Sequence, residues 1–204
     1  MKTFRLLFAF AFAGICLSMA SCIDSKNPIS DPEKAKVDQK FLGVWRMADK
    51  GGDVIYYHVG LAGGKLPRGV LRAISIRHNK DGSVGGPDEL LLFCTEAGNS
   101  RFLNVACVDR KEDLEKLDQS GWNAKLVNAY FIIKYELKDD SLKLWQMDRN
   151  AKAKAIEAGK IKGEITKNDV TFTDTSENLA KFLADPANAG LFDAKDSIRY
   201  DRVK

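Results

Sequence analysis

The chain has 204 residues, of which 45% are hydrophobic and 29% are charged, and its formal net charge is +4 at pH 7. This length suits a single domain with a substantial core. The lysines and arginines are scattered along the chain rather than clustered, so the charge pattern excludes an extended basic surface for nucleic acid.

The first 21 residues have the plan of a secretory signal peptide. Lys2 and Arg5 precede an uncharged apolar run over residues 6–17, and small residues lead from that run to Cys22. At 1.5 Å per residue, a run of about a dozen residues spans only ~18 Å, short of the ~30 Å hydrocarbon core. We therefore expect this segment to be removed rather than retained as a spanning helix.

The residues around the cleavage point indicate which kind of signal this is. Met19-Ala20-Ser21-Cys22 resembles the bacterial lipobox, which prefers leucine where this chain has Met19. The resemblance implies a lipidated cysteine at position 22. The alternative is ordinary cleavage near Ala20 or Ser21, which would leave Cys22 as a free thiol.

Lipidation of Cys22 would place the protein at a membrane surface. One acyl chain binds membranes only marginally, whereas the three chains of a bacterial lipoprotein anchor it in effect irreversibly. In Gram-negative sorting, an aspartate directly after the lipidated cysteine retains a lipoprotein in the inner membrane. Ile23 holds that position here. We therefore expect a bacterial envelope protein, held at the outer membrane and facing the periplasm.

The mature chain divides into a tether and a domain. Residues 22–39 are polar and contain Asn27-Pro28 and Asp31-Pro32, which is typical of a flexible lipidated tether. From residue 40 to residue 204 the pattern is mostly β, with turn residues at intervals that suit an antiparallel meander. The clearest alternation runs over residues 125–137, with Phe131 and Tyr135 on one face.

The remaining elements complete a mainly β domain. We predict ten strands, at residues 41–47, 54–59, 69–77, 90–95, 101–108, 125–137, 142–147, 161–166, 170–173 and 197–203. Short helices are predicted at residues 111–118, from a cap at Asp148 or Asn150 to Ala158, and from a cap at Thr175 or Ser176 to Asp185-Pro186. This content fits a small antiparallel barrel or strongly curved sheet, with two or three short helices covering it.

Cys94 and Cys107 lie on adjacent predicted strands of one hairpin. An oxidising compartment would allow them to pair. A turn at Gly98-Asn99 puts Cys94 opposite Leu103, four residues from Cys107 and about 13 Å away at ~3.3 Å per residue. A disulfide therefore requires a slipped or longer loop, and the alternative is two small buried thiols.

Three further segments suggest a family. They are residues 142–148, 170–182 and 198–203, and together with Leu42-Gly43-Val44-Trp45 they resemble bacterial lipoproteins of unknown function with small lipocalin-like β domains. In lipocalin-type domains such a glycine and tryptophan close one end of the barrel. The resemblance implies a fold and no activity.

The candidate chemistry is that of a binding module rather than an enzyme. No serine sits in a nucleophile-elbow pattern, and His58 and His78 fall on separate strands without metal-ligand spacing, so we assign no catalytic residue, metal or cofactor. We expect a hollow barrel holding a small hydrophobic or lipid-like ligand. The alternative is a filled barrel that acts as an envelope protein-interaction or structural module. The aromatic residues that could line a cavity are Phe131, Tyr135, Trp145 and Phe172.

Overall fold

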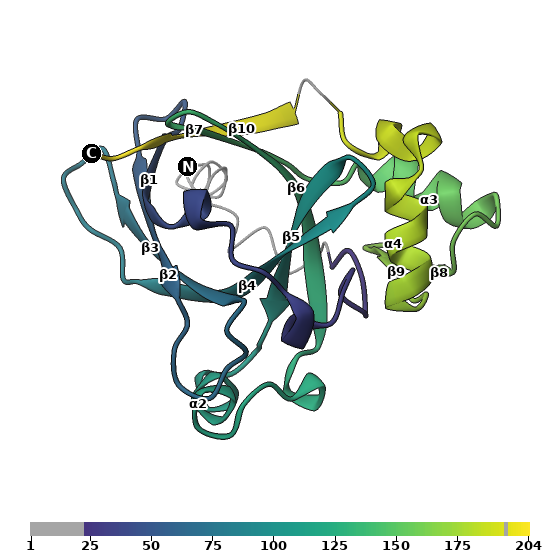
Figure 1. The fold of residues 1–204 in the computed structure, drawn as a ribbon. Coiled ribbons are helices and arrows are strands. Elements are labelled where there is room, and N and C mark those ends of the chain that lie inside the picture. Colours follow the sequence, from purple (N-terminus) through teal and green to yellow (C-terminus); the bar gives the residue numbers. More distant parts are fainter. Residues whose placement is uncertain (1–22, 194–195) are drawn as a thin grey trace, which may run out of the picture.

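The computed structural model describes residues 23–193 and 196–204. Within these residues, eight strands form a closed antiparallel barrel in the order β1-β10-β7-β6-β5-β4-β3-β2, and β8 and β9 form a small separate sheet (Figure 1). The strands are β1 (Gly43–Ala48), β2 (Val54–Leu61), β3 (Val70–His78), β4 (Asp88–Ala97), β5 (Ser100–Cys107), β6 (Ala129–Lys138), β7 (Ser141–Trp145), β8 (Gly163–Ile165), β9 (Val170–Phe172) and β10 (Ser197–Arg202). The predicted mainly β fold is confirmed, and this closed barrel is compatible with a lipocalin-like fold.

Short helices surround part of the barrel. The α-helices are α2 (Lys111–Ser120), α3 (Arg149–Glu157) and α4 (Ser176–Ala184). The 3-10 helices are η2 (Pro32–Lys34), η3 (Gln39–Phe41), η4 (Ala124–Leu126) and η5 (Pro186–Leu191). Two of the predicted caps are confirmed, because the side chain of Asp148 accepts from the Ala151 amide and that of Thr175 from the Asn178 amide.

The inside of the barrel is one hydrophobic core, built by alternation along each strand. Side chains at every second position point inward, as the pleat of a strand requires. Members of this inner core include Trp45 on β1, Leu92 on β4 and Tyr200 on β10, all less than 5% exposed. The face of β6 that carries Phe131 and Tyr135 also points inward, as its alternation predicts.

A second core lies outside the barrel, against the outward faces of β4, β5 and β6. Phe93, Phe102 and Ile132 point away from the barrel interior and are still almost fully buried. They are covered by the helices and by the β8–β9 sheet, whose Phe172 is 0% exposed. Leu179 of α4 is likewise 0% exposed. These three strands are therefore buried on both faces.

The segment predicted as a flexible tether is instead packed against the barrel. Residues 23–38, called here the strap, run along the outer core toward η3 (Figure 1). Ile29 of the strap is 2% exposed, and its amide donates to Oδ1 of the buried Asn104 over 2.7 Å. Farther along, a Cβ at Gly69 would collide with the Ala35 carbonyl, so glycine is needed there. The prediction of a tether is wrong for these residues because their few apolar and capping side chains find partners that only the folded barrel supplies.

The start of the strap completes a hydrogen-bond ladder. β7 pairs only with residues 134–138 of β6, which leaves the first half of that edge of β6 open. Ser25 fills it: the Tyr130 amide donates to the Ser25 carbonyl over 2.8 Å, and the Phe172 amide donates to the Asp24 carbonyl over 2.9 Å. The strap thereby joins the β8–β9 sheet to the barrel. It also gives hydrogen-bond partners to backbone groups of β6 and β9 that would otherwise have none.

A buried ion pair also holds the start of the strap against α3. Nζ of Lys152 on α3 lies 2.6 Å from Oδ1 of Asp24, and the side chains are only 2% and 8% exposed. The other carboxylate oxygen accepts from the Ile132 amide over 3.0 Å. Burial raises the pKa of Asp24, while the Lys152 ammonium opposes that shift. Such a pair tolerates little displacement, because either charge left alone would be costly.

Candidate functional site

The barrel interior contains a small apolar cavity. Its volume is about 50 Å³. The lining side chains are hydrophobic or aromatic: Phe41, Trp45, Tyr57, Val59, Ala73, Leu90, Leu92, Leu103, Val105, Ile133, Leu142, Leu144 and Tyr200. Pockets for small molecules usually measure ~300–1,000 Å³. The interior is therefore filled mainly by its own side chains.

None of the four aromatic residues predicted to line a cavity lines this one. Tyr135 belongs to the inner core and Phe131 packs against it. Trp145 is half-buried on β7, and Phe172 lies in the outer core on the other side of the barrel wall. Trp45, Tyr57 and Tyr200 line the cavity instead. The closure of β1 on β10 brings Trp45 and Tyr200 together around the cavity, which the sequence pattern did not predict.

One end of the barrel is closed by η3 and the residues around Trp45. The indole Nε1–H donates to the Phe41 carbonyl over 2.8 Å, and the Arg202 guanidinium lies 4.3 Å from the centre of the indole ring. Arg202 also donates to the Leu42 carbonyl over 2.7 Å. This arrangement ties β10, β1 and η3 together. Closure of one end near Gly43 and Trp45 agrees with what the resemblance implies.

A polar group lies beside this closed end. One carboxylate oxygen of Asp38 accepts from Arg101 over 3.1 Å and from the Tyr135 hydroxyl over 3.2 Å. Arg101 also lies 5.0 Å from the centre of the Tyr135 ring. Burial raises the pKa of Tyr135 above its ordinary value, so the phenol stays protonated. The group joins the end of the strap to β5 and β6.

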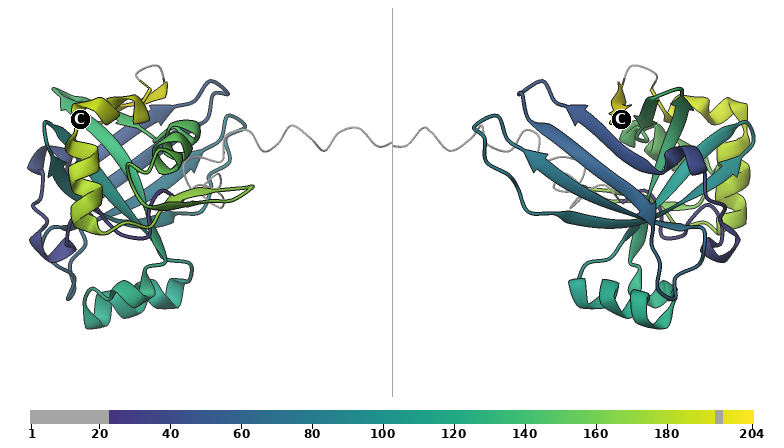
Figure 2. Two further views of the ribbon diagram at one scale, coloured as in Figure 1. Left: turned by 90° about the vertical axis from the view of Figure 1, so that its right-hand side faces the viewer. Right: turned by 60° about the vertical axis from the view of Figure 1, so that its left-hand side comes forward.

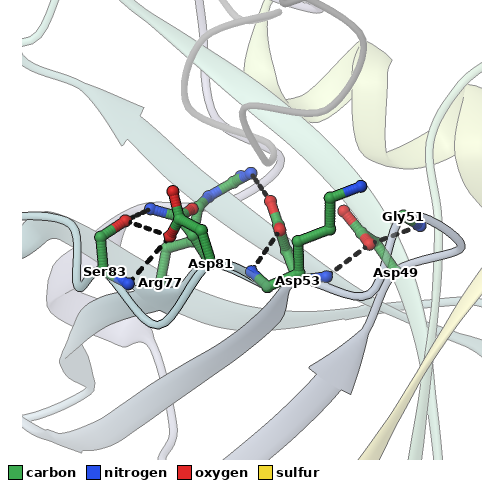
Figure 3. Close-up of polar contacts among 8 residues, drawn as sticks. Asp49, Gly51, Asp53, Arg77, Asp81 and Ser83 are labelled. Atoms are coloured by element: carbon green, nitrogen blue, oxygen red, sulfur yellow. Dashed lines mark hydrogen bonds and ion pairs between the residues drawn. The ribbon is translucent and has the colours of Figure 1, made fainter.

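The loops at the other end of the barrel are held together by aspartates (Figure 3). In the β1–β2 loop, Asp49 accepts from the amides of Gly51 and Asp53 over 2.7 and 3.0 Å. Asp53 pairs with Arg77 near the end of β3 at 3.3 Å and accepts from the Lys80 amide of the β3–β4 loop at 3.1 Å. Each carboxylate is engaged in fixing the loops, so this acidic cluster is best explained as structural.

The outward side of β1, β2 and β3 is the face that the helices leave open. α3 and α4 lie on the opposite side of the barrel (Figure 1). Cross-strand pairing places two rows on this open face, Val44–His58–Ile74 and Arg46–Tyr56–Ile76. A groove of about 350 Å³ runs over part of it, lined by Gly43, Val44, His58, Val59, Gly60, Leu61, Arg72 and Ile74.

Both histidines lie on this open face. His58 stands opposite Ile74, and His78 packs edge-on against Tyr56 with ring centroids 5.2 Å apart. His78 lies four residues along β3 from Ile74, the residue opposite His58. The two histidines are therefore about 13 Å apart along the strands, at ~3.3 Å per residue. Within the described residues no group of three His, Cys, Asp or Glu side chains could hold a metal ion.

The two cysteines of the hairpin are free thiols. The register puts Cys94 opposite Leu103, as the turn predicts, whereas Cys107 stands opposite Ala129 of β6. The disulfide alternative is therefore wrong, because the regular hairpin has no slip to bring the sulfurs together. Burial raises the pKa of both thiols, that of Cys107 to about 12. Cys94 is buried and Cys107 is half-buried.

The predicted lipidation site lies outside the described residues, as does the predicted signal peptide. In the part of the chain that the structure describes, no helix is both long enough and apolar enough to cross a membrane. No protein-family model matches the sequence, and neither a curated protein nor a solved structure shows significant similarity to it.

Proposed function

We propose that this protein is a lipid-anchored, non-catalytic module of the bacterial envelope that binds another protein through its outer surface. Cys22 carries the lipid in this proposal, with the outer membrane as the site of anchoring and the periplasm as the compartment. The observation that supports it is the combination of a filled barrel with an open sheet face. An interior cavity of about 50 Å³ leaves the outer surface as the larger place for recognition.

The open face has the composition of a protein-binding surface. Tyrosine and arginine are enriched at such interfaces, and Tyr56 and Arg46 stand side by side across β2 and β1. Ile74 on the open face is 36% exposed, and Leu61, 59% exposed, lies at the rim of the groove at the end of β2. Large exposed hydrophobics that gather beside a groove are typical of binding sites rather than of plain solvent-facing sheet.

Native mass spectrometry of the protein extracted from its own membrane tests this proposal. We expect a protein partner bound in fixed stoichiometry, lost in Ile74→Glu, which puts a charge at the centre of the open face. Ala189→Glu is the matched control, because Ala189 is exposed on η5 beside α4, on the opposite side of the barrel, and should leave the partner bound. Equal retention or equal loss of the partner in the two variants would contradict the assignment of the face.

One observation favours a second candidate, the binding of a small hydrophobic ligand. The cavity is lined by apolar side chains throughout, and such cavities stay dry and accept apolar guests. At its present volume it suits only a very small guest, so a lipid-like ligand would require the inner core to expand. The same mass spectra decide between the two, since a co-purifying small molecule displaced by Ala73→Leu would favour this candidate.

A further inference from the structure

The described chain begins at a fixed point on the barrel wall. The Ile23 carbonyl accepts from Oγ1 of Thr171 over 3.3 Å, and the amides of Asp24 and Ser25 both donate to the Tyr130 carbonyl. Consecutive Cα atoms are only 3.8 Å apart. A lipid on Cys22 would therefore be attached within one residue of this point, with no free linker between anchor and barrel.

The topology identifies the end of the barrel at which this point lies. Tyr130 stands opposite Ala106, one residue before the end of β5. In an antiparallel barrel of consecutive strands, the β5–β6 connection lies at the same end as the β1–β2 and β3–β4 loops. The first residues of the strap therefore lie at the end that carries those loops, opposite the end closed by η3.

The β8–β9 hairpin extends in the same direction as these loops. In the left view of Figure 2 its tip projects from the body on the side where the β1–β2 and β3–β4 loops also project. The hairpin is attached to the strap through Phe172, whose carbonyl accepts from the Lys26 amide over 2.9 Å. Loops, hairpin and start of the strap together form one end surface, called here the anchor end.

The anchor end presents exposed apolar tips and lysines on a firm base. Val84 in the β3–β4 loop is 60% exposed, and Ile165 at the end of β8 is 45% exposed. Lys80 and Lys167 are exposed beside them, as are the acidic residues Asp81 and Glu164. A β-bridge to His78 of β3 holds Val84, and the Gly85 amide next to it donates to the Arg77 carbonyl over 2.9 Å. The Asp53 contacts join this loop to the β1–β2 loop (Figure 3).

We propose that the anchor end rests on the bilayer surface, with Val84 and Ile165 at the level of the lipid headgroups. This orientation rests on the proposed lipidation of Cys22. Apolar side chains at the interface gain from leaving water, and lysines beside them approach lipid phosphates. The end closed by η3 then faces away from the membrane. Because the strap is docked on the barrel, it holds the domain next to the bilayer and does not separate the two.

Fluorescence quenching in vesicles tests the orientation. The full lipidated protein is reconstituted in vesicles of phosphatidylcholine and phosphatidylglycerol that carry a headgroup nitroxide. A fluorophore is placed on Val84→Cys, on Ile165→Cys or on Leu61→Cys. Leu61 is the matched control: it is 59% exposed but lies at the far end of β2, about 23 Å along the strand at ~3.3 Å per residue.

We expect several-fold stronger quenching at positions 84 and 165 than at position 61. Equal quenching at all three positions, or stronger quenching at position 61, would overturn the orientation. Hydrogen exchange of the unmutated lipidated protein gives an independent measurement. Amides of residues 79–87 should exchange more slowly on vesicles than in detergent, and those of residues 61–65 should not.

A flotation assay separates this proposal from the anchor itself. Protein that floats with the vesicles but shows no difference between positions 84 and 61 retains its anchor and contradicts only the orientation. Protein that fails to float, with no acyl mass on the mature chain, contradicts both. The Cys22→Ser variant should remain at the bottom of the gradient.

Discussion

The inner and outer cores are buried to the same extent but are built in different ways. The inner core is built mainly by the barrel strands, each of which contributes alternate side chains, and Phe41 of η3 closes one end of it. The outer core is closed by segments distant in sequence: the strap, the β8–β9 sheet and the three helices. Adjacent residues of β4 illustrate the contrast, because Leu91 faces the outer core and Leu92 the inner one, at 1% and 4% exposure.

This difference teaches that three of the eight barrel strands depend on the segments that cover their outward faces. β4, β5 and β6 expose hydrophobic surface on their outward faces unless the strap and helices are docked. Apart from Val70 at the start of β3, the outward faces of β1, β2 and β3 stand without a cover and carry histidine, arginine and tyrosine. If the outer layer is part of the cooperative fold, its residues should affect stability as much as those inside the barrel.

The largest expected effect comes from the ion pair beneath the strap. Asp24→Asn leaves the 2% exposed Lys152 ammonium without its partner, so we expect a loss of about 3–5 kcal/mol in urea denaturation. Combining it with Lys152→Met should recover most of the loss, since the buried charge is then gone. Glu177→Gln, which breaks the fully exposed pair with Lys181, is the control and should leave the midpoint unchanged. A single Asp24→Asn variant as stable as the wild type would show that the strap is not docked.

A matched pair on β4 compares the two cores directly. Leu91→Ala and Leu92→Ala remove the same atoms from opposite faces of one strand, and each should cost about 2–5 kcal/mol by thermal or urea unfolding. The measurement is the free energy of unfolding of each variant against wild type. A cost for Leu91→Ala far below that for Leu92→Ala would mean that the outer layer is an accessory to an independently stable barrel.

A smaller effect is expected at the polar contact between strap and wall. Asn104 is 0% exposed; its Oδ1 accepts from Ile29 and its Nδ2 donates to Thr95 over 2.8 Å. Asn104→Ala leaves the Ile29 amide unsatisfied and should cost about 1–3 kcal/mol. Hydrogen exchange at that amide should accelerate more than exchange in β1 or β2. Uniform acceleration across the barrel would indicate that the strap does not open separately.

The smallest effect is expected at the cysteines. Reduction should leave the melting temperature unchanged because Cys94 and Cys107 are free. With a pKa of about 12, Cys107 holds only about one thiolate in 10⁴ molecules at pH 8, so iodoacetamide should react slowly until urea exposes both thiols. Thiol counting by intact mass, with and without urea, checks this. A shift of the melting temperature on reduction would contradict the free thiols.

The sequence by itself determined the β content, the turns and the inward face of β6. Alternation along residues 129–138 and the Gly98-Asn99 turn specify faces and register locally, since side chains in a strand alternate whatever the strand contacts. The caps at Asp148 and Thr175 are local for the same reason. The lipidation of Cys22 is likewise a sequence-based expectation.

Only the tertiary structure decided the role of the strap, the lining of the cavity and the open face. Asp24 and Ser25 look like tether residues because their partners, Lys152 and Tyr130, are more than 100 positions away. Phe172 lies outside the lining because β9 belongs to the separate two-stranded sheet, and Trp145 because it faces away from its cavity-lining neighbour Leu144. Contacts between residues this far apart in the sequence produce no local periodicity, so the sequence pattern could not predict them.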